Sequence, residues 1–259
     1  MKKIAPPSKS GTAKIVLPSG VPSACYIYGI LDLGQKVVLK KSRAMGQGTS
    51  AKIYTIPFED ISALVSRTQY VQYDPSEKNL LIHNDALQEA RSTYRCSILP
   101  LRFSTVAKSE GDVMKILSSG HSKFKEKLAF LNGKLEIATK VYCKIDELKQ
   151  SIIARRGKGG KEDHQSTDDA LKKESYELAN GLLKILEPMS VKHQLNDLIF
   201  DDMIMNAAFL LEEREVKGFV DAVKSYEEEH GRYLKIQISG PYVPYSFTDP
   251  EDGSERNKG

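Results

Sequence analysis

Apolar and polar residues alternate along several short stretches of the chain, and this pattern predicts β-strands. It is clearest over residues 135–143, where Leu, Ile, Thr, Val and Cys take every second position. A period of two places one face of a strand against a core and the other toward solvent. Residues 25–30, 51–56 and 234–238 have the same character, so we expect strands there as well.

Two further strands are predicted from less regular patterns. The segment MIMNAAFLL, residues 203–211, is almost continuously apolar and short, as expected of a central strand that is buried on both faces. Residues 96–106 also have strand character, and Pro100 within them indicates a sheet edge or a bulge because proline cannot donate to a ladder. Residues 191–198 form a weaker strand candidate.

The first half of the chain also has patterns that favour helices. We expect a short helix over residues 58–65 and a longer one over residues 84–92. Asn84 or Asp85 would cap the longer helix by accepting hydrogen bonds from its exposed amides.

Three longer helical patterns follow. Apolar residues recur at helical spacing over residues 110–131, but Gly120 interrupts them and predicts two consecutive helices that bridge two domains. A helix capped by Thr167 is predicted over residues 167–186, and another over residues 215–229.

The order of these elements predicts an α+β protein with two domains. Residues 134–239 give strand, helix, strand, strand, helix, strand, which is the ferredoxin-like β-α-β-β-α-β arrangement. We assign residues 24–133 to an N-terminal α+β domain with bridging helices, and residues 134–248 to the ferredoxin-like domain and a closing segment. Residues 1–23 and 249–259 are predicted to be flexible tails.

Composition and charge narrow the classes of function. The chain has 259 residues, 40% of them hydrophobic, and a net charge of only +4, which falls short of the basic footprint of a dedicated nucleic-acid binder. No apolar run approaches the roughly 20 residues of a membrane-spanning helix, and we find no secretion signal. The three cysteines are far apart, without a CxxC pair, which indicates the reducing cytosol. The run RRGKGGK, residues 155–161, is predicted to be a solvated loop.

Motifs for catalysis, cofactors or metals are weak. GQGTSAK, residues 46–52, lacks the Gly-Lys-Ser/Thr ending of a phosphate loop. Asp201 and Asp202 are adjacent, and we interpret them as a charged turn at the end of a strand rather than as an acid/base pair. No nucleophile elbow is present. The five histidines show no metal-ligand spacing, namely His83, His121, His164, His193 and His230. We predict no enzyme, no cofactor and no metal site.

Four stretches together resemble one known family. They are YIYGI at residues 26–30, ILPLRFSTV at 98–106, DDMIMNAAFLL at 201–211 and ISGPYVPYSF at 238–247. In this order and approximate spacing they are similar to the gas vesicle protein F and L family, over about residues 25–248. The resemblance does not separate the F member from the L member.

This resemblance implies an accessory or minor structural protein of gas vesicles. Such a protein would bind the small hydrophobic shell protein GvpA, and other assembly proteins, and would assist vesicle assembly as a chaperone-like factor or as a wall component. It would be found in the cytoplasm and on the gas vesicle, and the family brings no catalytic residues. An RNA-binding ferredoxin-like module is the alternative, and a small-molecule sensor is a third possibility.

The partner-binding candidates lie in two proline-marked segments. In the first, the side chain of Arg102 either pairs with a carboxylate or tyrosine of the same chain, which we favour, or holds a carboxylate of a partner. The second segment either closes the core, which we favour, or forms a docking surface. The candidates are Leu99, Pro100, Arg102, Phe103, Tyr242, Pro244, Tyr245 and Phe247.

Overall fold

The structure is a computed structural model that describes residues 24–45, 52–69, 72–156 and 164–248. The chain divides into two compact units, Met1–Ala129 and Phe130–Gly259. The predicted tails, the loop GQGTSAK apart from its last residue, and all of RRGKGGK after its two arginines lie outside the described residues.

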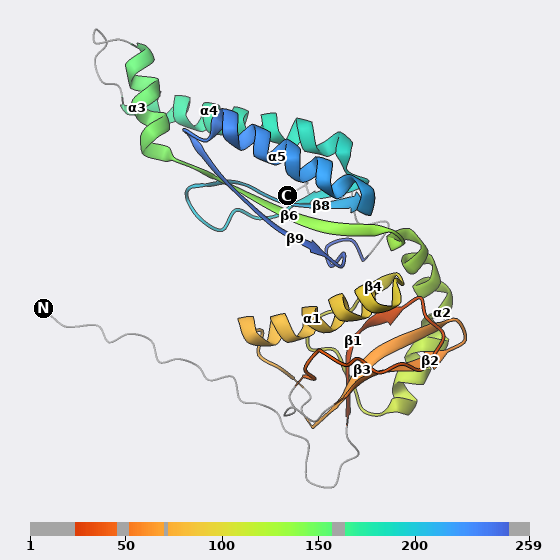
Figure 1. The fold of residues 1–259 in the computed structure, drawn as a ribbon. Helices are drawn as coiled ribbons and strands as arrows, with labels where there is room; N and C mark the ends of the chain where they lie inside the picture. The colour runs from red at the N-terminus through yellow and green to blue at the C-terminus, as the bar shows by residue number, and fades with distance from the viewer. Residues whose placement is uncertain (1–23, 46–51, 70–71, 157–163, 249–259) are drawn as a thin grey trace, which may run out of the picture. The chain divides into compact units, whose positions relative to one another are not determined.

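Unit 1 is built on an antiparallel sheet (Figure 1). Its strands are β1 (Ala24–Leu31), β2 (Ile53–Phe58), β3 (Ile61–Thr68), β4 (Ile98–Pro100) and β5 (Val106–Ala107), in the order β2-β3-β1-β4, with β5 also paired to β1. The strands predicted over residues 25–30 and 51–56 are confirmed as β1 and β2. Because β4 lies at the end of this order, the proline at its last position also lies at a sheet edge, as predicted.

The helix predicted over residues 58–65 is wrong, because most of this segment is strand β3. A turn at Glu59 and Asp60 joins β2 to β3, and Phe58 pairs with Ile61 across it. Strand β3 lies between β2 and β1 and is buried at all but one of its positions. A strand that buries both faces loses the alternation of apolar and polar residues, so its pattern cannot be told from that of a short buried helix.

Helix α1 (Glu77–Tyr94) begins seven residues before its predicted start. Asn84 and Asp85 therefore lie inside the helix, and the predicted caps are wrong. The helix packs on the face of β1 that carries Tyr26, because the Tyr26 hydroxyl lies 2.7 Å from Nδ1 of the buried His83.

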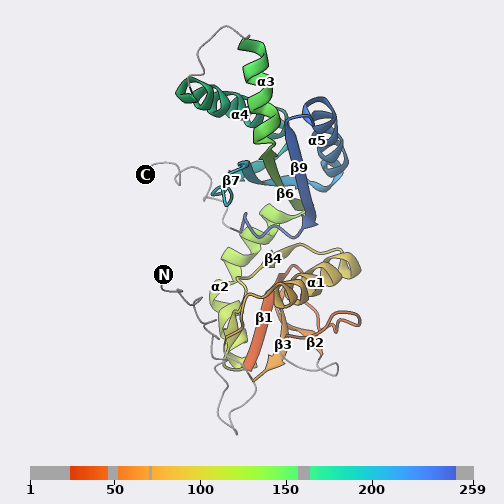
Figure 2. The ribbon, with the colours of Figure 1, turned by 90° about the vertical axis from the view of Figure 1, so that its left-hand side faces the viewer.

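Helix α2 (Glu110–Leu131) is one continuous helix, not the two that were predicted. A Cβ atom at Gly120 would lie only 2.5 Å from the ring of Phe124, so the glycine makes room for an aromatic ring one turn later. The helix begins where Glu110 accepts a hydrogen bond from Arg67 of β3. Arg67 and its neighbour Ser66, which bonds to Tyr28 on the α1 side, point to opposite faces of the sheet, so α1 and α2 cover different faces (Figure 2).

Unit 2 is built on a second antiparallel sheet. Its strands are β6 (Lys134–Cys143), β7 (Lys192–Leu195), β8 (Met203–Glu212) and β9 (Leu234–Tyr242), in the order β7-β8-β6-β9. The central strand β8 is buried at all but two of its positions, which confirms the prediction made from MIMNAAFLL. Strands β7 and β9 form the two edges of the sheet (Figure 2).

The described part of unit 2 also has three helices, two between β6 and β7 and one between β8 and β9. They are α3 (Ile145–Arg156), α4 (His164–Leu186) and α5 (Val216–His230), with short 3₁₀ turns at Glu187–Met189 and Glu213–Glu215. Helices α4 and α5 lie side by side over one face of the sheet (Figure 1). The helix predicted over residues 167–186 corresponds to α4, and no helix was predicted where α3 occurs. Thr167 lies inside α4, so the predicted cap is wrong.

The core of unit 2 lies between this sheet and the helix pair. Phe209 of β8 packs on Phe219 of α5, with 5.0 Å between ring centroids, and Leu182 of α4 is completely buried beside them. On both α4 and α5 the residues that enter the core follow the 3.6-residue period, which is why these two helices could be predicted. Among the described residues, no helix is both long and apolar enough to span a membrane.

Candidate partner-binding surfaces

The first predicted segment lies at the edge strand of unit 1. Leu99 and Pro100 are buried in β4, where they pair with Ile30 and Gly29 of β1. The ring of Phe103 is half-buried, and Arg102 alone of the four candidates here has an exposed side chain. This segment is therefore mainly part of the core of unit 1, and Arg102 is the candidate that it exposes to solvent.

The second predicted segment closes the sheet of unit 2. Tyr242 ends β9 opposite Glu136, and Pro244 and Phe247 are buried. Tyr245 keeps 36% of its surface exposed, against 2% for Phe247. Of the two interpretations made from the sequence, the burial of Phe247 supports closure of the core, while Tyr245 remains accessible.

A buried carboxylate holds this closing segment in place. Glu136 of β6 is only 7% exposed, and its two oxygens accept hydrogen bonds from the backbone N–H and the hydroxyl of Ser246, both at 2.8 Å. Burial raises the pKa of Glu136, and the donors of Ser246 lower it in part. A buried carboxyl is costly unless it is hydrogen-bonded, so Glu136 fixes the path of the chain after β9.

Exposed apolar side chains also occur at the end of edge strand β7 and in the loop that follows it. Leu198, Ile199 and Phe200, in the loop between β7 and β8, are 56%, 61% and 58% exposed, and Leu195 at the end of β7 is 48% exposed. A contiguous group of exposed apolar residues is typical of an interaction site. We call Leu195 and residues 197–202 the β7 surface.

The loop of the β7 surface is held by its backbone. The Asp197 carbonyl accepts a hydrogen bond from Nδ2 of Asn206 at 2.8 Å, and the Asp202 carbonyl accepts one from the Cys143 N–H at 2.7 Å. The ring of Phe200 lies 6.4 Å from that of Tyr142 on β6. The fold therefore keeps this loop against the sheet while the apolar side chains remain open to solvent.

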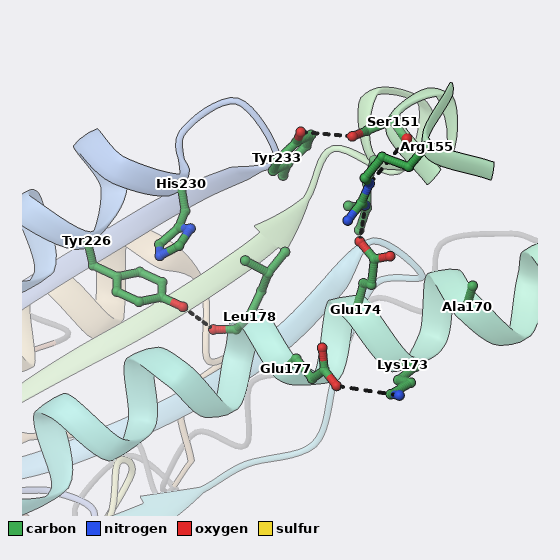
Figure 3. Close-up of a pocket in the computed structure, with 11 residues that line it drawn as sticks. Ser151, Arg155, Ala170, Lys173, Glu174, Glu177, Leu178, Tyr226, His230 and Tyr233 are labelled. Carbon is green, nitrogen blue, oxygen red and sulfur yellow. Dashed lines mark hydrogen bonds and ion pairs between the residues drawn. The ribbon is translucent and has the colours of Figure 1, made fainter. Parts of the chain in front are cut away.

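A hollow of about 670 Å³ lies where α3 departs from α4 and α5 (Figure 3). Its charged residues pair with each other: Arg155 with Glu174, and Lys173 with Glu177. Its hydroxyl groups are also engaged, since Ser151 bonds to Tyr233 at 2.9 Å and Tyr226 donates to a backbone carbonyl. A ligand would have to replace these bonds, so the hollow presents few polar groups ready for binding. The lining residues that make these ion pairs and hydrogen bonds are Ser151, Arg155, Lys173, Glu174, Glu177, Tyr226 and Tyr233.

One group of side chains with possible metal ligands occurs in unit 1. Glu59, Asp60 and His121 bring their ligand atoms within 4.8 Å of one another. The Lys125 ammonium, however, lies 2.7 Å from Asp60 and 2.9 Å from Asp32. Hydrogen bonds from Lys125, and then from His121, lower the pKa of Asp60 to about 2. The lysine supplies the positive charge that a cation would bring, so the group is an ion-pair network of the fold.

The cysteines do not form a reactive site in the described part of the chain. Cys25, Cys96 and Cys143 are all free thiols. Burial raises the pKa of Cys25 and of Cys96 to about 11, so both stay protonated near neutral pH and are poor nucleophiles.

Sequence reasoning missed the β7 surface. The strand predicted over residues 191–198 included Leu198, whereas β7 ends at Leu195, and no element was predicted for residues 199 and 200. The signal in the sequence was the pair Asp201 and Asp202, which was correctly interpreted as a turn: the two residues lie in the turn before β8 and are exposed. An apolar run that ends in a charged turn can be buried or exposed, and only the fold decides which.

Comparison with known proteins gives one consistent result. Residues 24–249 match the family described as gas vesicle synthesis protein GvpL/GvpF. Gas vesicle protein F1 of Halobacterium salinarum is 24% identical over 235 residues, covering 90% of this chain and 97% of that protein. Gas vesicle protein L of a Streptomyces species is 28% identical over 188 residues, covering 63% of this chain and 66% of that protein.

Solved structures have the same fold. The crystal structure of GvpF from Anabaena superposes with a TM-score of 0.74 at 23% identity, covering 88% of this chain and 97% of that one. GvpF from Microcystis aeruginosa superposes with a TM-score of 0.68 at 21% identity, covering 88% of this chain and 100% of that one. The mixed helix and sheet architecture is therefore that of solved GvpF proteins.

Proposed function

The chain belongs to the gas vesicle synthesis protein GvpL/GvpF family, and from this we propose that it binds the gas vesicle shell protein GvpA and assists the assembly of the vesicle. Membership of the family supports a role in gas vesicle formation. The finer role, as an accessory factor or minor wall component that contacts the shell protein directly, is our proposal.

The β7 surface is the observation that carries this proposal. A small hydrophobic shell subunit has apolar surface to cover before it assembles, and a partner that covers it needs exposed apolar side chains of its own. Leu198, Ile199 and Phe200 provide them next to the edge strand β7. Strand edges and neighbouring apolar residues are a common docking combination, because backbone and side-chain contacts act together.

The two segments singled out in the sequence take a smaller part in the proposal. Arg102 and Tyr245 are accessible and are proposed as secondary contacts, Arg102 through its forked donors. The buried members of both segments support these contacts by holding the backbone. They are Leu99, Pro100, Pro244 and Phe247.

We propose that the protein acts by binding and not by catalysis, in the cytoplasm and on the vesicle. The RNA-binding alternative gains no support from the sheet of unit 2. Ala208 and Leu210 of β8 point away from α4 and α5, yet both are buried. The described face therefore lacks the open aromatic platform on which RNA bases stack.

Co-expression with GvpA, followed by flotation of intact vesicles, tests the proposal. The protein should be found with GvpA in the floating vesicles or in a soluble complex. Replacing Leu198 and Ile199 together by Ser should reduce that association. Replacing Ile153 and Ile185, which are exposed apolar residues of α3 and α4, by Ser provides the control. Absence of the protein from both fractions would overturn the proposed function.

A further inference from the structure

Aspartates flank the apolar residues of the β7 surface on both sides in the chain. Asp197 precedes Leu198, and Asp201 and Asp202 follow Phe200. All three aspartates are exposed. In the described part of the chain, none of their carboxylates has an ion-pair or hydrogen-bond partner, whereas other acidic residues of unit 2, such as Asp168 and Glu174, are paired with basic side chains.

The backbone of β7 is open on the side away from β8. The Asn196 N–H donates to the Asn206 carbonyl at 2.7 Å, which makes these residues a hydrogen-bonded pair of the antiparallel ladder. Because such pairs alternate along the strand, the N–H and C=O groups of His193 and Leu195 point away from β8. No other described strand pairs with this edge.

We infer that the β7 surface binds a basic amphipathic segment of a protein partner. Apolar residues of that segment cover Leu198, Ile199 and Phe200, and its lysines or arginines face the aspartates on either side of them in the chain. The exposed aspartates favour a positively charged segment, because an acidic segment would bring like charges together, which is unfavourable. The inference deepens the proposed function, since it specifies the part of the shell protein, or of another assembly protein, that would dock here.

Two synthetic peptides of equal length test the sign of the charge. Both have the same leucine and isoleucine positions, and the intervening positions are lysine in one peptide and glutamate in the other. Binding to the full chain is measured by fluorescence anisotropy. The lysine peptide should bind and the glutamate peptide should bind at least about tenfold more weakly, with added salt reducing the difference. Equal binding of the two peptides would overturn the inference.

Variants of the full chain locate the site. Replacing Asp197, Asp201 and Asp202 together by Asn preserves shape and should weaken binding of the lysine peptide about tenfold, the expected sum of three exposed charge interactions. Changing Asp221 to Asn, Glu228 to Gln and Glu229 to Gln, all exposed on α5, removes the same number of negative charges and controls for net charge. If the aspartate variant binds as well as the control variant, the inference is wrong.

The apolar part of the site has its own variant. Leu198→Ser with Ile199→Ser should weaken binding of the lysine peptide by about tenfold or more, whereas Ile153→Ser with Ile185→Ser should leave it unchanged. Removal of residues 1–23, which contain several lysines, should not alter the affinity. A gain in affinity on their removal would identify this chain's own N-terminal segment as the occupant and overturn the inference.

Binding of GvpA separates this inference from the proposed function. If GvpA binds the protein and the aspartate and Leu198/Ile199 variants bind it equally well, the proposed function stands and the inference fails. If the lysine peptide binds at the β7 surface while GvpA does not bind at all, the proposed function fails and the inference stands.

Discussion

The carboxylate of Glu136 accepts two hydrogen bonds from a single residue, Ser246, 110 positions later in the chain. One comes from the backbone N–H and the other from the hydroxyl. Strand β6 and the closing segment are thereby joined by two hydrogen bonds to a carboxyl group that is itself buried. The contact holds the chain that follows β9 against β6.

Ser246→Ala should destabilise the protein by about 1 to 3 kcal/mol. The substitution leaves an oxygen of the buried Glu136 carboxyl without its hydroxyl donor. A buried acceptor that has neither water nor a donor destabilises the folded state. Urea unfolding measures the change in the free energy of unfolding. Ser225→Ala, at an exposed position of α5, is the control and should cost almost nothing. Equal stability of the two variants would show that the hydroxyl contact contributes little.

His83 should make the stability of the protein depend on pH. The side chain is 2% exposed, and burial lowers the pKa of His83 to about 4. As pH falls, the unfolded chain, with an ordinary histidine pKa, takes up the proton first. Stability present above about pH 6.5 is therefore lost progressively down to pH 4, by about 3 kcal/mol in total.

The contribution of His83 is isolated by comparison with His83→Gln. Urea unfolding of both proteins between pH 4 and pH 7.5 gives two curves, and the curve of the variant should be flatter. The variant retains a polar group near the Tyr26 hydroxyl, which lies 2.7 Å from Nδ1 of His83. Parallel curves would assign the acid sensitivity to other groups.

Gly34 should not tolerate a side chain. A Cβ atom there would lie 2.3 Å from the Glu59 carbonyl oxygen and 2.7 Å from the Asp60 Cα. Both are backbone atoms of the β2–β3 turn, so relief requires the turn to move. Gly34→Ala should therefore lower the free energy of unfolding by about 2 kcal/mol.

Gly111→Ala is the matched control for Gly34→Ala. The nearest atom to a Cβ at Gly111 is 3.6 Å away, and the residue lies in the first turn of α2. Alanine favours the helix over glycine, so this variant should be as stable as the natural chain or slightly more stable. Thermal melting of the two variants side by side checks the prediction, and similar losses in both would contradict it.

The sequence predicted most strands and helices of unit 2 because their side chains follow a clear period. Strand β6 buries every second residue, and α5 buries Phe219, Val223 and Tyr226 on one face. The prediction failed at β3, because burial on both faces removes the alternation. It also failed at α3, because apolar residues such as the adjacent pair Ile152 and Ile153 do not mark a single face. A helix or strand shows a clear sequence period only when one of its faces is buried. Elements with uniform or irregular burial lack that period and are missed.

The candidate site was less predictable than the fold. Leu198 and Phe247 are both apolar residues beside polar ones, yet the first is 56% exposed and the second 2% exposed. What separates them is the path of the chain, set by contacts between residues that are apart in the sequence, such as the one between Ser246 and Glu136. A single sequence does not reveal such contacts, so it named residues of the closing segment and missed those of the β7 surface.

The two aromatic residues near the end of the closing segment should respond to substitution in opposite ways. Phe247 is 2% exposed and Tyr245 is 36% exposed. Phe247→Ala should cost about 3 to 5 kcal/mol of stability, because it removes a buried ring and leaves a cavity. Tyr245→Ala should cost less than about 1 kcal/mol. Urea unfolding of both variants measures the contrast.

Binding of GvpA by the same two variants then separates closure of the core from docking. At a temperature where both variants are folded, Phe247→Ala should retain binding, because its ring faces the core and not the partner. Tyr245→Ala should weaken binding, because Tyr245 is proposed as a secondary contact, but by less than Leu198→Ser with Ile199→Ser. If Tyr245→Ala instead abolishes binding while the Leu198 and Ile199 variant binds normally, the closing segment, and not the β7 surface, is the main docking site.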